Sequence, residues 1–179
     1  MSGRRSKKGG GALSFSLYIL LILILAVCLR AFVAERVVVV GESMEPTLDN
    51  GDNVLIEKIS CRLGKTDRYD IVVFPVGDTL LIKRVYGLPG ETVRIDDAGV
   101  IYIDDKPIED RYGYEPMREA GRAGGYGVTL AGDEYFVLGD NRNNSIDSRM
   151  LDVGSVRNKN IRGRVVLRLT PFNKMGKTD

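Results

Sequence analysis

The chain begins with one long apolar segment. Residues 13–34 (LSFSLYILLILILAVCLRAFVA) are almost wholly apolar over about 22 positions, enough for a helix to cross a hydrocarbon core. A buried core helix, a cleaved signal peptide and a retained membrane anchor compete as explanations. A core helix is rarely apolar on every face over this length. Cleavage before Glu35 would leave Phe32 at the −3 position, where small residues are required. We therefore expect a transmembrane signal-anchor at 13–34.

Beyond the anchor the pattern is that of β-strands. Short apolar or β-branched runs bounded by turn residues predict strands at 36–40, 53–58, 69–75, 79–86, 92–95, 100–103, 128–130, 134–138 and 163–169. No segment after residue 40 has a convincing helical period. Residues 108–127 are rich in glycine and charge, which indicates a loop or small insertion rather than core. We therefore expect a mainly β fold over residues 35–179.

The distribution of charge predicts how the anchor is oriented. The net charge is +2, and residues 1–10 alone contribute +4, so the remaining chain carries −2. Basic residues beside an apolar segment mark its cytoplasmic side. We expect residues 1–12 to be a basic cytoplasmic head. Residues 35–179 should lie outside the cell, held to the plasma membrane by a single pass.

Composition also excludes several classes of protein. A near-neutral body does not support nucleic-acid binding, which needs a concentrated basic surface. One of the two cysteines, Cys28, lies inside the apolar segment and the other, Cys61, beyond it, so we expect no disulfide. With no histidine and no cysteine pair at metal-ligand spacing, we expect no metal site.

The absence of histidine also limits how a serine could be activated. A serine hydroxyl is a poor nucleophile near neutral pH unless a positioned base takes its proton. The remaining candidates are a carboxylate, the amino terminus and a lysine of lowered pKa, and Ser-Lys pairs occur on several unrelated folds. Ser43 lies in the segment GESMEPTL (41–48), where Gly41 leaves room for another backbone and Pro46 restricts the chain. An ordinary surface turn has the same properties.

Lys83 is the lysine with the most apolar setting. It lies in TLLIKRVY (79–86), between Leu81, Ile82 and Val85. A lysine in a low-dielectric environment has a lowered pKa, and its neutral amine can accept a serine proton. The alternative is an edge-strand lysine that points to water together with Arg84.

A third polar segment, GDNRNNSIDSR (139–149), follows the apolar strand EYFVL. Such a run is usually a solvated loop whose charge pairs contribute little. Ending a strong strand with so many hydrogen-bonding groups is also a way to build a shell that fixes a catalytic lysine. The two interpretations differ in whether these side chains are buried.

Four segments in order resemble the successive motifs of type I signal peptidases: GESMEPTL, RYDIVVF (68–74), IKRVYGLPGE (82–91) and GDNRNNSIDSR. These enzymes are membrane-anchored Ser-Lys endopeptidases that remove signal peptides from exported proteins. One such segment is weak evidence, but four in order behind an anchor are highly specific. The resemblance implies an antiparallel β catalytic domain with a small insertion around 97–130 and no cofactor. It also implies three partners, namely preproteins, the lipid bilayer and the secretion translocon.

The resemblance further implies roles for individual residues. Ser43 corresponds to the nucleophile and Lys83 to the general base. Ser145 corresponds to the serine that orients the lysine amine. The supporting ion-pair network corresponds to Asp147, Arg149, Arg84 and Asp140. The backbone N–H of Ser43 is expected to stabilise the oxyanion.

One position departs from part of the family. Gly41 stands where some members have a serine, so a side-chain oxyanion donor is absent there and a backbone group or water must serve. This resembles the Gram-positive branch. The substrate is expected to add as an extended strand through main-chain hydrogen bonds. Shallow pockets for small side chains at −1 and −3 are expected from Val39, Val40, Gly41, Met44, Leu48, Leu81 and Ile82.

Several alternatives stay open beside this interpretation. Peptidases of the endoplasmic-reticulum type use histidine in place of the lysine, whereas mitochondrial inner-membrane peptidases use the Ser-Lys pair and are not excluded. Self-cleaving regulators of the SOS-repressor type resemble this chain in their chemistry and β fold, but they are soluble. An inactive membrane-tethered binding module would not need the serine, the lysine and the ion-pair segment together.

Overall fold

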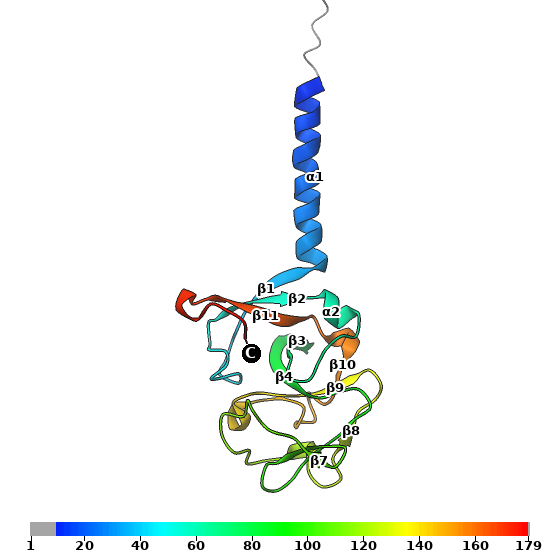
Figure 1. Ribbon diagram of the computed structural model, residues 1–179, viewed down its shortest axis with the longest axis vertical. Coiled ribbons are helices and arrows are strands. Elements are labelled where there is room, and N and C mark those ends of the chain that lie inside the picture. The colour runs from blue at the N-terminus through cyan, green and yellow to red at the C-terminus, as the bar shows by residue number, and fades with distance from the viewer. Residues whose placement is uncertain (1–9, 179) are drawn as a thin grey trace, which may run out of the picture.

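The computed structural model describes residues 10–178, so most of the predicted basic head (1–9) lies outside the described residues. Helix α1 (Gly10–Phe32) projects from one end of a β domain (Figure 1). The side chains of residues 14–28 in this helix are all exposed. Among the described residues, no helix combines the length and apolar character needed to cross a membrane.

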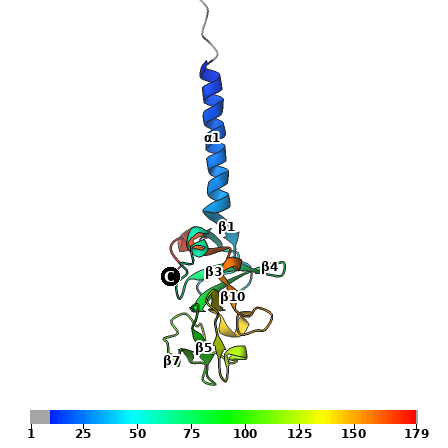
Figure 2. The same cartoon turned by 90° about the vertical axis from the view of Figure 1, so that its right-hand side faces the viewer.

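The β domain is built on a seven-stranded antiparallel sheet, seen from two directions in Figures 1 and 2. Its order is β1 (Ala34–Val38), β2 (Asn53–Glu57), β11 (Gly163–Thr170), β3 (Ile71–Val76), β4 (Thr79–Gly87), β9 (Glu134–Leu138) and β10 (Val156–Arg157). Alternating apolar positions bury one face of β2, whereas β3 and β9 are buried over most of their length. The prediction of a mainly β, antiparallel fold is confirmed.

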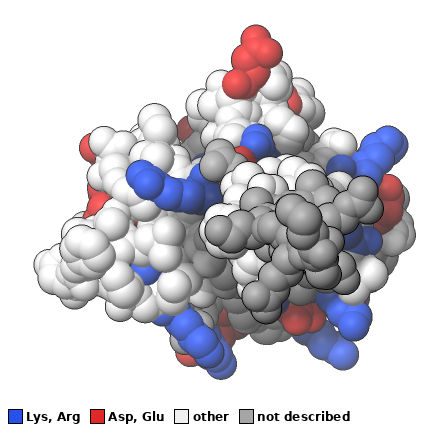
Figure 3. Space-filling view, turned by 90° about the horizontal axis from the view of Figure 1, so that it is seen from above, with Lys and Arg blue, Asp and Glu red and all other residues white. Residues whose placement is uncertain are grey.

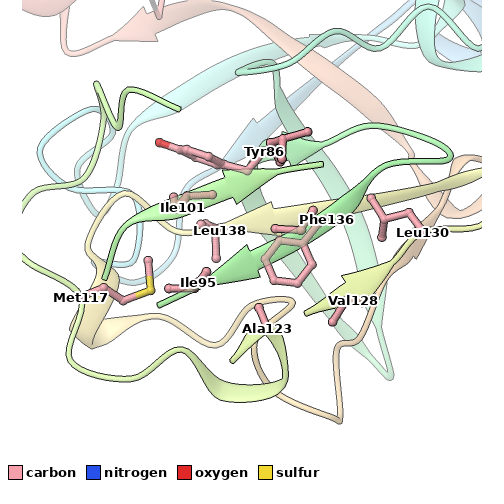
Figure 4. Packing of buried hydrophobic residues seen from close by; sticks show 11 residues of the cluster. Tyr86, Ile95, Ile101, Met117, Ala123, Val128, Leu130, Phe136 and Leu138 are labelled. Atoms are coloured by element: carbon pink, nitrogen blue, oxygen red, sulfur yellow. The ribbon is translucent and has the colours of Figure 1, made fainter. Parts of the chain in front are cut away.

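A smaller four-stranded sheet packs against the end of the large one. Its order is β7 (Lys106–Pro107), β6 (Ile101–Ile103), β5 (Thr92–Ile95) and β8 (Val128–Thr129). Figure 4 shows Tyr86, Phe136 and Leu138 of the large sheet packed against residues such as Ile95 and Ile101 of the small one. The small sheet therefore stabilises the ends of β4 and β9, the two strands that lead into the candidate site.

Gly87 is where β4 meets this shared core. A Cβ atom added there would lie 2.4 Å from Val93 Cγ2 and 2.9 Å from Phe136 Cβ. Only glycine leaves the space for this contact, because real Cβ atoms do not approach other heavy atoms so closely.

The structure differs from the sequence predictions mainly in short elements. Helix α2 (Ile59–Arg62) and the two-residue strands β7 and β10 were not predicted. Within residues 10–178, 3₁₀ turns also occur at η1 (Gly121–Ala123), η2 (Arg142–Asn144), η3 (Asn158–Asn160) and η4 (Phe172–Lys174). The prediction that residues 108–127 lie outside the core is wrong for Met117 and Ala123, which are buried in the core between the sheets.

Candidate active site

Ser43 lies in the turn that joins β1 to β2. Gly41 has φ +92°, a left-handed conformation that strains any residue with a side chain, although nothing lies near the position of its missing Cβ. Met44 and Leu48 bury their side chains in the core below, and Leu48 N–H donates to the Met44 carbonyl at 2.8 Å. The turn is therefore fixed by apolar burial on one side while it presents the Ser43 hydroxyl on the other.

Lys83 lies on β4, and its side chain reaches Ser43. Its Nζ donates to Ser43 Oγ at 2.6 Å and to the Ile82 carbonyl at 3.0 Å, and the residue is only 2% exposed. Because side chains alternate along a strand, Lys83 shares its face with Leu81 and Val85. It also pairs directly with Val72 of β3. The alternative of a water-facing edge lysine is wrong, since the side chain is buried.

Burial lowers the pKa of Lys83 to about 8, because desolvation penalises the ammonium form. The carboxylates of Asp147 and Asp140 oppose this shift, and the positive charge of Arg149 adds to it. The like charge that acts on Lys83 is therefore that of Arg149. At this pKa a useful fraction of the amine is neutral near physiological pH.

Asp147 is a fully buried carboxylate that organises the segment after β9. It accepts hydrogen bonds from Ser145 Oγ at 2.7 Å, from Gly139 N–H at 3.0 Å and from Arg149 Nε and Nη2 at 2.8 and 2.9 Å. Ser145 thus bonds to Asp147, and within the described residues it makes no hydrogen bond to Lys83. Ser145 therefore acts on the amine only indirectly, through a carboxylate whose charge raises the pKa of Lys83.

Arg84 forms the second buried ion pair of the site, with Asp140. Arg84 Nε and Nη2 donate to the two carboxylate oxygens at 2.9 and 2.7 Å, and the residues are 1% and 0% exposed. Thr47 Oγ1 donates to the same carboxylate at 2.6 Å, and the Arg84 guanidinium lies 3.6 Å from the centre of the Tyr112 ring. Asp147 pairs instead with Arg149.

The segment after β9 also forms hydrogen bonds with the backbone around Ser43. Asn141 N–H donates to the Ser43 carbonyl at 3.1 Å, and Asn141 Nδ2 donates to the Glu42 carbonyl at 3.2 Å. A Cβ atom at Gly139 would lie 2.6 Å from the Ser43 carbonyl oxygen and 2.2 Å from Ser145 Oγ. Gly139 therefore allows the serine turn and this segment to approach each other.

Arg142 links the same segment to Tyr86 of β4 and to Asp110 in the loop after β7, contacts that the sequence did not predict. Its guanidinium donates to the Gly139 carbonyl at 3.0 Å, to Tyr86 Oη at 2.7 Å and to the Asp110 carboxylate. Burial raises the pKa of Tyr86 well above its ordinary value. The hydroxyl is therefore a neutral donor, and it bonds to Asp110 at 2.7 Å.

A cleft of about 410 Å³ opens beside Ser43 and Lys83. It is lined by Gly41, Glu42, Ser43, Leu81, Lys83, Asn143, Asn144, Ser145 and Ile146. Glu42, Asn143, Asn144 and Ile146 were not predicted as lining residues, although the quoted segments contain all four. Ile146 is 64% exposed at the cleft, and Asn144 Nδ2 donates to the Glu42 carboxylate at 3.2 Å.

Of the predicted substrate-contacting residues, only Gly41 and Leu81 line this cleft. Val40 does not line it but is 86% exposed and adjoins Gly41. Four others have buried side chains in the core beneath the serine turn and so do not contact the cleft: Val39, Met44, Leu48 and Ile82. Among the described residues, no cluster of acidic or cysteine side chains is arranged to hold a metal ion.

Comparison with known proteins agrees with this geometry. Residues 12–170 match the family described as signal peptidase, peptidase S26. A probable signal peptidase I-2 from Synechocystis is 41% identical over 162 residues, which covers 86% of this chain and 71% of that protein. Signal peptidase I S from Bacillus subtilis is 34% identical over 186 residues and the full length of both chains.

A crystal structure of a signal peptidase I from Enterococcus faecalis aligns with a TM-score of 0.45 and 30% identity, over 56% of this chain and 96% of that one. At this TM-score the superposition adds nothing, and the assignment rests on the sequence matches. The chain belongs to the signal peptidase family, peptidase S26, and is a peptide-bond hydrolase of the signal peptidase I type.

Proposed function

We propose that this enzyme removes N-terminal signal peptides from exported preproteins with a Ser43–Lys83 dyad. The observation that carries the proposal is the 2.6 Å contact between Lys83 Nζ and Ser43 Oγ, made by a lysine whose pKa is lowered to about 8. A buried amine beside a hydroxyl is the arrangement that a Ser-Lys mechanism requires.

The acylation step begins with Lys83 in its neutral form. The amine accepts the Ser43 proton while Oγ attacks the carbonyl carbon of the scissile peptide bond. The resulting ammonium then donates that proton to the leaving amine, the C–N bond breaks, and the signal peptide stays attached to Ser43 as an ester. In the second half, Lys83 takes a proton from water while the water oxygen attacks the ester carbonyl carbon. The ammonium then donates that proton to Ser43 Oγ as the C–Oγ bond breaks, which frees the signal peptide as a carboxylic acid and restores the serine.

The Ser43 backbone N–H supplies the oxyanion donor in this proposal. It has no hydrogen-bond acceptor anywhere in the described part of the chain, so it is available to a substrate oxygen. Gly41 cannot add a side-chain donor. Asp147, held by Ser145 and Arg149, and Asp140, held by Arg84, keep the surroundings of the lysine rigid.

The substrate binds as an extended strand beside β4 in this account. Residues 79–83 pair with β3 on one side, whereas pairing with β9 starts only at Arg84. The other edge of 79–83 thus offers unpaired main-chain groups next to the cleft. Gly41, Leu81 and Ile146 leave a shallow apolar space, which suits small side chains at −1.

Residues 13–34 are the membrane anchor of the proposed enzyme. The support is their apolar sequence and the exposure of side chains at 14–28, which leaves a long run of apolar surface with no protein packed on it. The basic head then lies in the cytoplasm and residues 35–179 form the extracytoplasmic domain. There the enzyme meets preproteins as they leave the translocon.

Cleavage of a purified preprotein by the full chain tests the function. The wild type should release the mature protein and Ser43→Ala should not. An active Ser43→Ala enzyme would contradict the assigned nucleophile. Topology is tested separately with a C-terminal tag, which external protease should remove from spheroplasts. Complete protection of that tag would contradict the proposed orientation.

A further inference from the structure

A second cleft, of about 410 Å³, lies away from Ser43, between helix α2 and the η3 turn. It is lined by Lys58, Arg62, Asn158, Lys159, Ile161 and Arg162. Four of these six side chains are cationic, and the proposed reaction assigns no role to any of the four. The cleft is therefore a candidate for binding an anion.

The acids nearby leave this cleft with a net positive charge. Glu35 is shared between Lys58, at 2.8 Å, and Arg162. Glu57 accepts hydrogen bonds from the backbone N–H groups of Ile59 and Ser60, both at 3.0 Å. Lys159 and Arg62 have no ion-pair partner among the described residues.

The cleft adjoins the end of α1. Lys58 N–H donates to the Val33 carbonyl at 2.9 Å, and the Arg62 guanidinium lies 5.7 Å from the centre of the Phe32 ring. Figure 3 looks down on this end of the molecule, where Lys and Arg side chains project at several places around the edge, with Asp and Glu side chains among them. Ile59 and Leu63, at α2, expose apolar side chains beside the same cations.

This combination matches the chemistry of a membrane surface. Cations near an anionic bilayer are attracted to its surface, and exposed apolar side chains add contact with the acyl boundary. If residues 13–34 cross the bilayer, as the proposed function requires, the cleft lies at the depth of the lipid phosphates, because it contacts the residues where that segment ends.

We propose that the cleft between α2 and η3 binds the phosphate-bearing headgroup of an anionic phospholipid, such as phosphatidylglycerol. Binding there would fix the catalytic domain against the bilayer at the base of α1, beyond the tether that the anchor alone provides. The inference rests on the membrane-anchored function proposed above.

The test uses the full chain in neutral detergent, titrated with phosphatidylglycerol and examined by native mass spectrometry. The wild type should retain the lipid, and Arg62→Gln/Lys159→Gln should bind it about tenfold more weakly or worse. The matched control is Lys106→Gln/Arg111→Gln, which removes the same charge at exposed positions on and near β7, at the far end of the domain (Figure 1). This control should bind like the wild type.

Two further variants separate charge from folding. Arg62→Lys/Lys159→Arg keeps both charges and should restore retention. Lys159→Glu changes an exposed residue that has no hydrogen bond in the described structure, and should weaken binding without unfolding. Equal retention by the wild type, Arg62→Gln/Lys159→Gln and Lys159→Glu would overturn the proposal.

Two controls identify the ligand and the source of any failure. Phosphatidylcholine should be retained poorly, and inorganic phosphate should not displace phosphatidylglycerol. Displacement by phosphate would identify a free-phosphate site and overturn the lipid assignment.

Cleavage of a soluble signal-peptide substrate is measured on the same samples, and Arg62→Gln/Lys159→Gln should cleave at the wild-type rate. Loss of cleavage in the wild type would contradict the proposed function while leaving the lipid measurement interpretable.

Discussion

Replacing Asp140 with asparagine should destabilise the enzyme more than any exposed charge change. Asp140 and Arg84 are fully buried, and the carboxylate accepts two hydrogen bonds from the guanidinium and one from Thr47. Asparagine keeps the shape but leaves the Arg84 charge buried without a counter-charge. Breaking one side of such a pair costs about 3–5 kcal/mol, a large fraction of the stability of a typical domain.

A solvent-exposed pair provides the matched comparison. Glu109 and Arg111 lie 2.9 Å apart but are 72% and 63% exposed. Glu109→Gln should therefore change stability by no more than about 1 kcal/mol. Arg84→Met/Asp140→Leu removes both buried charges, and it should recover much of the stability that Asp140→Asn loses.

Urea unfolding of the full chain in detergent measures these differences. Tyrosine fluorescence is the natural probe, because the chain has eight tyrosines and no tryptophan. If Asp140→Asn unfolds within about 1 kcal/mol of the wild type, the buried charge of Arg84 is stabilised in some other way, and the reasoning is refuted. Asp140 also raises the pKa of Lys83, so any residual activity of Asp140→Asn should extend to lower pH.

Three further predictions concern catalysis. Ser43→Ala and Lys83→Met should each reduce turnover by about 10⁴-fold or more. Because the pair acts as a unit, the double variant should lose little beyond either single variant. Additive losses in single-turnover cleavage would argue against a dyad. Ser145→Ala removes one of the hydrogen-bond donors to Asp147. It should lower the cleavage rate by about tenfold and shift the midpoint of the pH–rate profile little. A rate unchanged from the wild type would show that this hydroxyl does not support the site. Peptides with Ala at −1 should be cleaved and those with Phe or Leu rejected by steric clash, and efficient cleavage of the bulky peptides would contradict the shallow cleft.

The regular part of the fold follows from local patterns in the sequence. The strands predicted at 92–95 and 134–138 have the observed bounds, since apolar alternation and flanking turn residues define them locally. Helix α2 spans four residues and β7 and β10 two each, lengths too short for any period to appear. Met117 and Ala123 are buried by a distant part of the chain, which local composition does not reveal.

The candidate site was predictable as a set of segments but less so as a set of contacts. The proximity of Ser43 and Lys83 follows from the motif resemblance and not from spacing. The alternation of side chains along β4 already indicates that Ile82 faces away from Lys83, a signal that the sequence analysis did not use. Which carboxylate pairs with Arg84 depends on how the segment after β9 folds over the sheet, and this requires the three-dimensional structure.

The pH dependence of single-turnover cleavage tests the central claim most directly. Lys83 must be neutral to accept the Ser43 proton, so the ammonium form is inactive and the rate must rise as pH climbs through the lysine's pKa. Burial places that pKa at about 8, so the account predicts an acidic limb centred near this pH. The chain has no histidine, so no histidine can produce an acidic limb at a pH between those expected for a carboxylate and for a lysine. A limb centred at about pH 4–5, the ordinary range of a carboxylate, would contradict the account and remove Lys83 from its role as the base.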